Sequence, residues 1–221
     1  MGKLTPGPKV ISLGEILKEK IVVSEKLVGE LQATEYWSDT FNLKYDSARL
    51  RSLNSPLILS DEWNLSRLPF KSYMDLYIPI TYVAIRDGGS SCSTSAACAK
   101  RILKEHEDRD SPDGYGVTEN FYVGDDGNVY EGIGWDRDMK WSFTGWRLTV
   151  SVQFFGEHEN DLPSAKAIEA FNTVIIRDGI ETGKLSPYYK IIPIPMVNGT
   201  SLGRKLREEI MTWKNAIENI S

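Results

Sequence analysis

The hydrophobic pattern from about residue 57 onward alternates between strand-like and helix-like segments. Residues 80–86 (ITYVAIR) form an apolar run, and residues 148–155 (LTVSVQFF) alternate apolar with polar positions, so both segments predict strands. Asp126-Gly127 lies between two short apolar runs and predicts a hairpin, because glycine accepts the positive φ that such turns require. Residues 190–197 (KIIPIPMV) predict a last strand, which its two prolines restrict to a sheet edge or to the end of a ladder.

Three helices are predicted between and after these strands. Ser93 or Thr94 can cap the first helix, which covers residues 96–108 and has a charged outer face. Pro163-Ser164 opens the second helix, which has apolar residues at helical spacing and ends at one of two glycines: Ile168, Phe171 and Ile175, then Gly179 or Gly183. Ser201 can cap the third helix, which has an apolar stripe of five residues: Leu202, Leu206, Ile210, Trp213 and Ile217.

Strands that alternate with helices indicate an α/β protein with helices on the faces of a sheet. Residues 1–56 differ, because their apolar and charged residues follow neither a strand period nor a helix period. We therefore expect two regions: an N-terminal extension over residues 1–56 and a globular domain over residues 57–221.

Composition and charge narrow the classes of partner. With 41% hydrophobic and 26% charged residues, the chain of 221 residues can bury a substantial core. A formal net charge of −5 provides no basic field for nucleic acid or for an anionic membrane surface. The sequence contains no apolar run of about 20 residues and no signal-peptide h-region, so membrane attachment is expected only through a segment outside this chain.

Cysteines and glycosylation sequons suggest an extracellular protein. Cys92 and Cys98 are the only two cysteines, and a local disulfide between them is favoured over a pair of reduced thiols. Three N-x-S/T sequons are possible glycosylation sites: Asn64, Asn198 and Asn219.

The two histidines do not have the spacing of metal ligands. His106 lies in a charged helix end and is expected to be solvated, and His158 lies in a polar loop. A zinc site built from Cys92, Cys98 and His106 is the remaining alternative, and the disulfide interpretation disfavours it.

Four motifs occur in order at compatible spacings: SSCSTSAAC, ENFYVGDDGNVYEGIGWD, GEHENDLPS and LREEIMTW. With them, the chain from about Ile58 to its end resembles the peptidoglycan recognition protein family. The resemblance implies a central mixed β-sheet flanked by helices, a fold related to N-acetylmuramoyl-alanine amidases. It also implies a bridge between Cys92 and Cys98.

Catalytic members of that family cleave the lactoyl-alanine amide of peptidoglycan with zinc, which two histidines and a cysteine hold near a tyrosine. On this sequence, the matching positions carry other residues: Arg86 for the first histidine, Pro193 or Ile194 for the second, Ser201 for the cysteine and Glu119 for the tyrosine. Arginine stays protonated and cannot ligate a cation. The resemblance therefore implies a noncatalytic member that holds no metal and needs no cofactor.

A different chemistry at the same place is the alternative. Asp87 follows Arg86, and together with Glu119 these residues could converge, so that a carboxylate pair would perform acid/base work. We favour an ion pair of Arg86 with Asp87 or Glu119 instead, because a buried charge needs a partner.

Binding members of the family grip a muramyl peptide in a groove above the sheet. Gly134 and Trp135 keep a family pair that is associated with diaminopimelate-type stem peptides, and Arg147 lies beside the position of a groove arginine. Bulky aromatic residues fill the loop between them: Trp141, Phe143 and Trp146. These three rings and Trp135 form either a patch that faces a partner or additional core that plugs the groove.

The resemblance therefore implies a noncatalytic receptor or co-receptor ectodomain of innate immunity, like those of membrane-associated insect members of the LC and LF types. Its expected partner is a sister ectodomain of the family, with a diaminopimelate-type muropeptide as the bridge. The alternative is a regulatory interaction protein, a decoy or inhibitor that binds a receptor without peptidoglycan. A zinc amidase is a distant third hypothesis because its ligands are missing.

Overall fold

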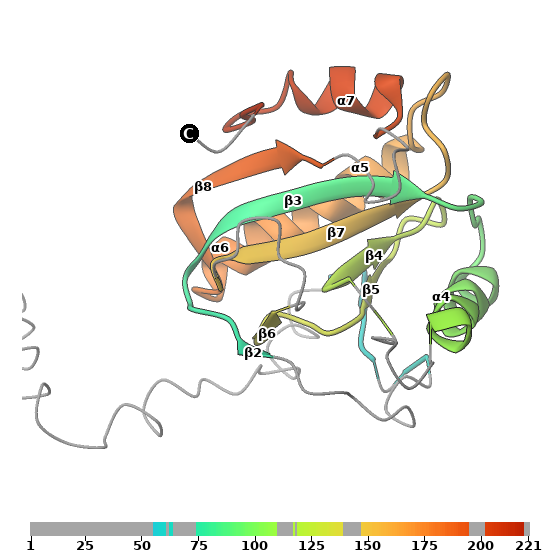
Figure 1. The fold of residues 1–221 in the computed structure, drawn as a ribbon, viewed down its shortest axis with the longest axis horizontal. Helices are drawn as coiled ribbons and strands as arrows, with labels where there is room; N and C mark the ends of the chain where they lie inside the picture. The colour runs from blue at the N-terminus through green and yellow to red at the C-terminus, as the bar shows by residue number, and fades with distance from the viewer. Residues whose placement is uncertain are drawn as a thin grey trace, which may run out of the picture. The chain divides into compact units, whose positions relative to one another are not determined.

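The computed structural model describes residues 55–60, 62–63, 74–109, 117, 119–138, 147–194 and 202–218 (Figure 1). Six strands form one mixed sheet in the order β1-β5-β4-β7-β3-β8. Their bounds are β1 Leu57–Ile58, β3 Ile80–Gly88, β4 Phe121–Val123, β5 Val129–Glu131, β7 Thr149–Phe155 and β8 Leu185–Pro193. Two short strands, β2 (Met74–Asp75) and β6 (Arg137–Asp138), form a separate antiparallel pair. The predicted α/β class with a central mixed sheet is confirmed.

The central strands run parallel. β3 pairs in parallel with β7 and with β8, and β4 pairs in parallel with β7. The carboxyl ends of these four strands therefore meet at one edge of the sheet, the edge at which open α/β sheets usually bind ligands.

One face of the sheet carries the main apolar core. In Figure 1, α5 (Ala165–Phe171) runs behind β3 and β7, and α7 (Arg204–Ile210) covers the same face. Side chains such as Ile85, Val152 and Phe154 pack there against Phe171 and Leu206. Burial of such side chains contributes about 1.5–3 kcal/mol each, so this face supplies most of the drive to fold.

The opposite face is covered in part by α4 (Ser95–Arg109). Ile102 and the disulfide between Cys92 and Cys98 pack there against Tyr122 and Phe155. The Cα atoms of the two cysteines are 5.2 Å apart, so the predicted local disulfide is confirmed. The Ala97 N–H donates to Thr94 Oγ1 over 3.3 Å, which identifies Thr94 as the capping residue.

The predicted strands are confirmed. β4 and β5 form the expected antiparallel hairpin, and Gly127 at its turn has a φ of +86°. β8 is an edge strand, as its prolines predict, but it spans Leu185–Pro193 instead of residues 190–197. In β7 the apolar alternation is correct, but the polar residues Ser151 and Gln153 between the apolar positions are buried as well, because the second face of the sheet is also covered.

The second helix begins where predicted and continues differently. Ser164 caps α5, since its Oγ accepts the Ala167 N–H. A π-helical segment, η3 (Asn172–Asp178), and α6 (Gly179–Glu181) follow. Of the two predicted end points, Gly183 is correct, with a φ of +72°, and Gly179 lies inside the helix. Gly179 is needed there for packing, because an added Cβ would stand 2.9 Å from the indole of Trp135.

The last helix is shorter than the apolar stripe predicts. α7 ends at Ile210, so Trp213 and Ile217 lie beyond it. The backbone instead turns through Asn215, which has a φ of +72°. Asn215 O then accepts the Ile191 N–H of β8, and the Ile217 N–H donates to Ile191 O. Pairing with the edge strand therefore ends the helix.

Several predictions concern positions outside the described residues. These are Ser201, the three sequons and residues 1–54 of the expected extension. Within the described part of the chain, no helix is long and apolar enough to cross a membrane.

Candidate functional site

Arg86 and Asp87 stand at the carboxyl end of β3 and leave opposite faces of the sheet, as neighbouring strand residues do. Arg86 lies on the face of Tyr122 and Gln153, because its register partner on β7 is Gln153, which in turn aligns with Tyr122 of β4. Asp87 aligns with Phe154 and lies on the face of the main core. The two charged side chains therefore lie on opposite faces of the sheet and have different neighbours.

The Arg86 guanidinium forms an ion pair with Glu119. Arg86 Nη1 lies 3.2 Å from Glu119 Oε1, and the side chains are 13% and 1% exposed. The predicted ion pair exists, and Glu119 rather than Asp87 is the partner. Such a pair neutralises two charges that would otherwise be costly to bury.

Asp87 holds two backbone segments instead. Its Oδ2 accepts the His158 N–H over 2.9 Å, and both carboxylate oxygens accept the Gly203 N–H at 3.2 Å. Gly203 is the residue before α7 and has no side chain to cap the helix. Asp87 therefore fixes the start of α7, and strand alternation places it on the other face of the sheet from Arg86.

A buried polar network lies beside the ion pair. Asn120 Oδ1 accepts from the N–H and the hydroxyl of Ser151 at 2.9 Å. Its Nδ2 donates to Gly134 O over 2.6 Å and to Arg137 O over 2.8 Å. Asn120 thereby joins β7 to the segment that carries the glycine-tryptophan pair. The sequence analysis missed this residue, although the polar positions of a buried strand signal such partners.

Trp135 is part of the core. It is 2% exposed, and its ring centroid lies 4.9 Å from that of Phe121. For this ring the core alternative is therefore correct. Trp141, Phe143 and Trp146 lie outside the described residues. Arg147 lies over the exposed ring of Tyr77, with its guanidinium carbon 4.5 Å from the ring centroid.

The two residues that can match the second family histidine do not suit zinc. Pro193 ends β8, and Ile194 is buried and donates its N–H to Ile85 O over 2.8 Å. A guanidinium, a pyrrolidine ring and an aliphatic side chain offer no lone pair to a metal. No group of three potential ligands comes together among the described residues.

Both histidines are more buried than the sequence predicts. His106 is 4% exposed and His158 is 5% exposed. His106 follows Cys98 and Ile102 at four-residue intervals on α4, so it faces inward despite its charged neighbours. Its predicted solvation is wrong for this reason.

The sequence is similar to those of known proteins. No family model matches the chain. A peptidoglycan recognition protein of Trichoplusia ni is 30% identical over 166 residues, which cover 74% of this chain and 90% of that protein. Peptidoglycan-recognition protein LE of Drosophila melanogaster is 32% identical over 162 residues, 72% of this chain, which spans 46% of that protein.

Solved structures agree with the sequence relatives. The structure of peptidoglycan recognition protein LE in complex with tracheal cytotoxin aligns with a TM-score of 0.67 at 30% identity, covering 74% of this chain and 96% of that one. The ectodomain of the Drosophila transmembrane receptor PGRP-LCa aligns with a TM-score of 0.65 at 25% identity, covering 73% and 99%. This chain therefore belongs to the peptidoglycan recognition protein family.

Proposed function

We propose that this chain is a noncatalytic receptor or co-receptor of peptidoglycan fragments in innate immunity. The observation that carries the proposal is the buried ion pair between Arg86 and Glu119, which stands where catalytic relatives are expected to hold zinc beside a tyrosine. A guanidinium neither binds a metal nor generates a metal-bound hydroxide, so the pair removes both parts of the amidase machinery at once.

The ligands of relatives support a proposal for the ligand class. Protein LE binds tracheal cytotoxin, a monomeric diaminopimelate-type peptidoglycan. This chain keeps Gly134 and Trp135, and Asn120 holds the backbone of Gly134 in place. A diaminopimelate-type muropeptide is therefore the fragment that this protein helps to sense, outside the cell, as the ectodomain character of PGRP-LCa supports.

A sister ectodomain of the family is the proposed partner. The aromatic loop from Trp141 to Trp146 carries the residue types that most often supply binding energy at interfaces. Tyr77 and Arg147, stacked on one another at the end of this loop, add an exposed aromatic and a cation. The sister molecule holds the muropeptide, and this chain closes over it.

A regulatory protein that binds the receptor without peptidoglycan is the second candidate. One observation favours it, because Arg86 is committed to Glu119 and its charge is compensated before any anionic stem peptide arrives. The same aromatic loop would then bind the receptor directly.

A mass measurement separates the two candidates. A monomeric diaminopimelate-type muropeptide is added to this protein, to a ligand-competent sister ectodomain and to their mixture, and the mass is followed by light scattering. A heterodimer only in the three-component sample supports the co-receptor. A heterodimer without muropeptide supports the regulator, and a mixture that stays monomeric throughout contradicts both.

One aromatic residue tests the proposed interface. Trp141→Ala should weaken binding of the sister ectodomain by about 2 kcal/mol if the ring anchors the interface. Tyr188→Ala, which removes an exposed aromatic ring of the edge strand β8, is the control and should leave binding unchanged. If Trp141→Ala lowers thermal stability and leaves the affinity intact, the ring belongs to the core instead.

A further inference from the structure

A cavity lies at the carboxyl edge of the sheet, and neither Arg86 nor Glu119 is among its lining residues. It has a volume of about 680 Å³, within the range of small-molecule sites. The loops that follow β3, β4 and β7 contribute its lining: Gly89, Ser90, Ser91, Asp125, Gly156, Glu157, His158, Asp161 and Leu162. This is the position where open α/β sheets usually bind ligands.

The lining carries negative charge and hydroxyl groups. Asp125, Glu157 and Asp161 contribute three carboxylates, and no lysine or arginine is among the lining residues. Asp125 is fixed in place, because its Oδ1 accepts the Ser164 N–H over 2.9 Å. The exposed side chain of Leu162 adds an apolar surface at the same cavity.

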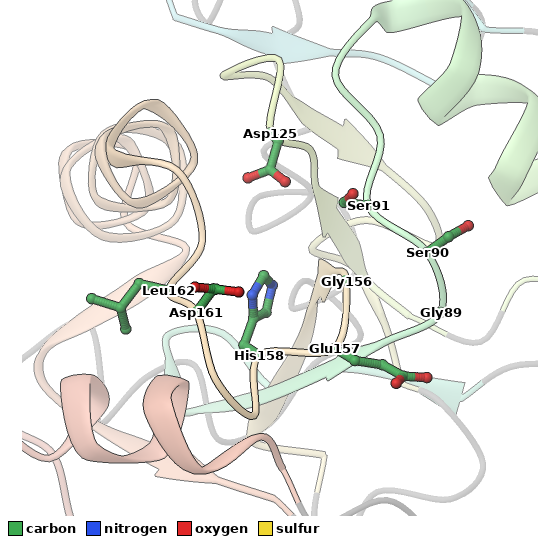
Figure 2. Close-up of a pocket in the computed structure, with 9 residues that line it drawn as sticks. All are labelled: Gly89, Ser90, Ser91, Asp125, Gly156, Glu157, His158, Asp161 and Leu162. Atoms are coloured by element: carbon green, nitrogen blue, oxygen red, sulfur yellow. The ribbon is translucent and has the colours of Figure 1, made fainter.

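His158 provides an independent indication of a ligand site. Its side chain is directed into the cavity between Asp125 and Asp161, as Figure 2 shows, although the residue is only 5% exposed. Its Nε2 is buried and has no hydrogen-bond partner among the described residues. A buried polar atom without a partner is costly, and such an atom in a cavity wall marks a place for a polar ligand.

Two features position the His158 backbone and leave room for its ring. The His158 N–H donates to Asp87 Oδ2. Gly156, which has a φ of +125°, leaves room for the imidazole, because an added Cβ would stand 2.9 Å from the ring. The space that the imidazole occupies at the cavity is therefore present before any ligand binds.

We propose that this cavity binds the primary ammonium group of an alkylamine. An ammonium has three donors and no acceptor, which suits carboxylates and the acceptor nitrogen of a neutral imidazole. The apolar surface of Leu162 suits the methylene chain of the amine. A metal ion suits the cavity less well, since no group of three metal ligands comes together among the described residues.

The same ammonium chemistry comes from two sources, a free small amine or a lysine side chain of a peptide. Two probes distinguish them: pentylamine, and a lysine derivative whose amino and carboxyl ends are blocked. Each is titrated into the full chain while the imidazole signals of His158 are followed by NMR. Pentanol, which keeps the chain length and lacks the charge, is the control ligand.

We expect a saturable shift of the His158 signals with pentylamine and little shift with pentanol. Neutralising the two exposed carboxylates with Glu157→Gln and Asp161→Asn should weaken amine binding by about fivefold or more, as the loss of exposed charge pairs predicts. Glu169→Gln removes one charge from the exposed side of α5 outside the cavity and should leave binding unchanged.

Saturable binding of the lysine derivative as well would identify a peptide side chain as the source, and binding of pentylamine alone a free amine. Three results would overturn the proposal. They are the absence of a saturable shift with either amine, equal shifts with pentanol, or an affinity that the double variant does not change.

Discussion

At the scale of single residues, the ion pair of Arg86 with Glu119 is the observation on which the proposed lack of catalysis rests. Glu119 is nearly inaccessible and Arg86 is mostly buried, so each charge depends on the other. Water cannot replace a lost partner at such a place. The pair is therefore a structural requirement of this chain and an obstacle to metal binding.

Glu119→Gln is expected to destabilise the protein by about 3 kcal/mol, because it leaves the Arg86 charge buried without its anion. Urea unfolding followed by tryptophan fluorescence measures the change. The double variant Arg86→Met with Glu119→Leu should recover most of the loss, since it leaves no unpaired charge. Glu218→Gln removes the partner of Arg207 in an exposed ion pair and should have little effect. If Glu119→Gln is as stable as the wild type, the pairing of Arg86 with Glu119 is contradicted.

Predictions for single residues failed where the residue's neighbours in sequence differ in character from its neighbours in space. His106 lies among charged residues, and only its spacing from Cys98 and Ile102 indicates that it faces inward. The sequence left Asp87 and Glu119 open as partners of Arg86, and Glu119 was a candidate despite 32 intervening residues because the family resemblance places both at one site.

At the scale of elements, a carboxylate from the central strand organises the start of α7. Asp87 accepts from the backbone of Gly203 and of His158, which lie far from it in sequence. No local sequence pattern predicts a helix cap that comes from such a distant residue. The hairpin of β4 and β5, in contrast, was predictable because Gly127 supplies its turn locally.

Asp87→Ala should cost about 2 kcal/mol of stability, because two buried N–H groups lose a charged acceptor. Hydrogen exchange of the Gly203 and His158 amides should accelerate more than that of β3 amides. Asp87→Asn keeps one acceptor oxygen, so its stability should lie between those of the wild type and of Asp87→Ala. If exchange at Gly203 is unchanged in the alanine variant, Asp87 does not hold the start of α7.

Tyr130 of β5 makes the hairpin sensitive to alkaline pH. Burial, together with its hydrogen bond to the Asp126 carboxylate at 2.6 Å, raises the pKa of the Tyr130 phenol above its usual range. Between the pKa of the unfolded chain, about 10, and the higher pKa of the folded chain, only the folded state keeps the proton. The stability that the neutral phenol contributes is therefore present below about pH 10 and is lost as the pH rises further.

Tyr130→Phe tests this pH dependence. The difference in unfolding free energy between wild type and variant should be constant up to about pH 9 and should shrink above about pH 10. Chemical denaturation at a series of pH values measures it. A difference that stays constant into the alkaline range would show that the phenol titrates alike in both states.

At the scale of the whole molecule, sequence patterns predicted the sheet and its helices, and the end of the chain was the exception. The stripe from Leu202 to Ile217 has helical spacing, yet the backbone leaves the helix after Ile210 to pair with Ile191. Pairing with a distant strand is a tertiary effect, and local spacing carries no information about it. The cavity around His158 was missed for the same reason, since three separate loops form it.

We propose that this family member is not an amidase, and an assay of hydrolysis with added zinc tests this proposal. The purified protein is incubated with zinc and a diaminopimelate-type muropeptide, cleavage of the lactoyl-alanine amide is followed by mass spectrometry, and bound zinc is determined after dialysis. We expect no cleavage product and no stoichiometric zinc. Product that accumulates with zinc and disappears with a chelator would contradict the account.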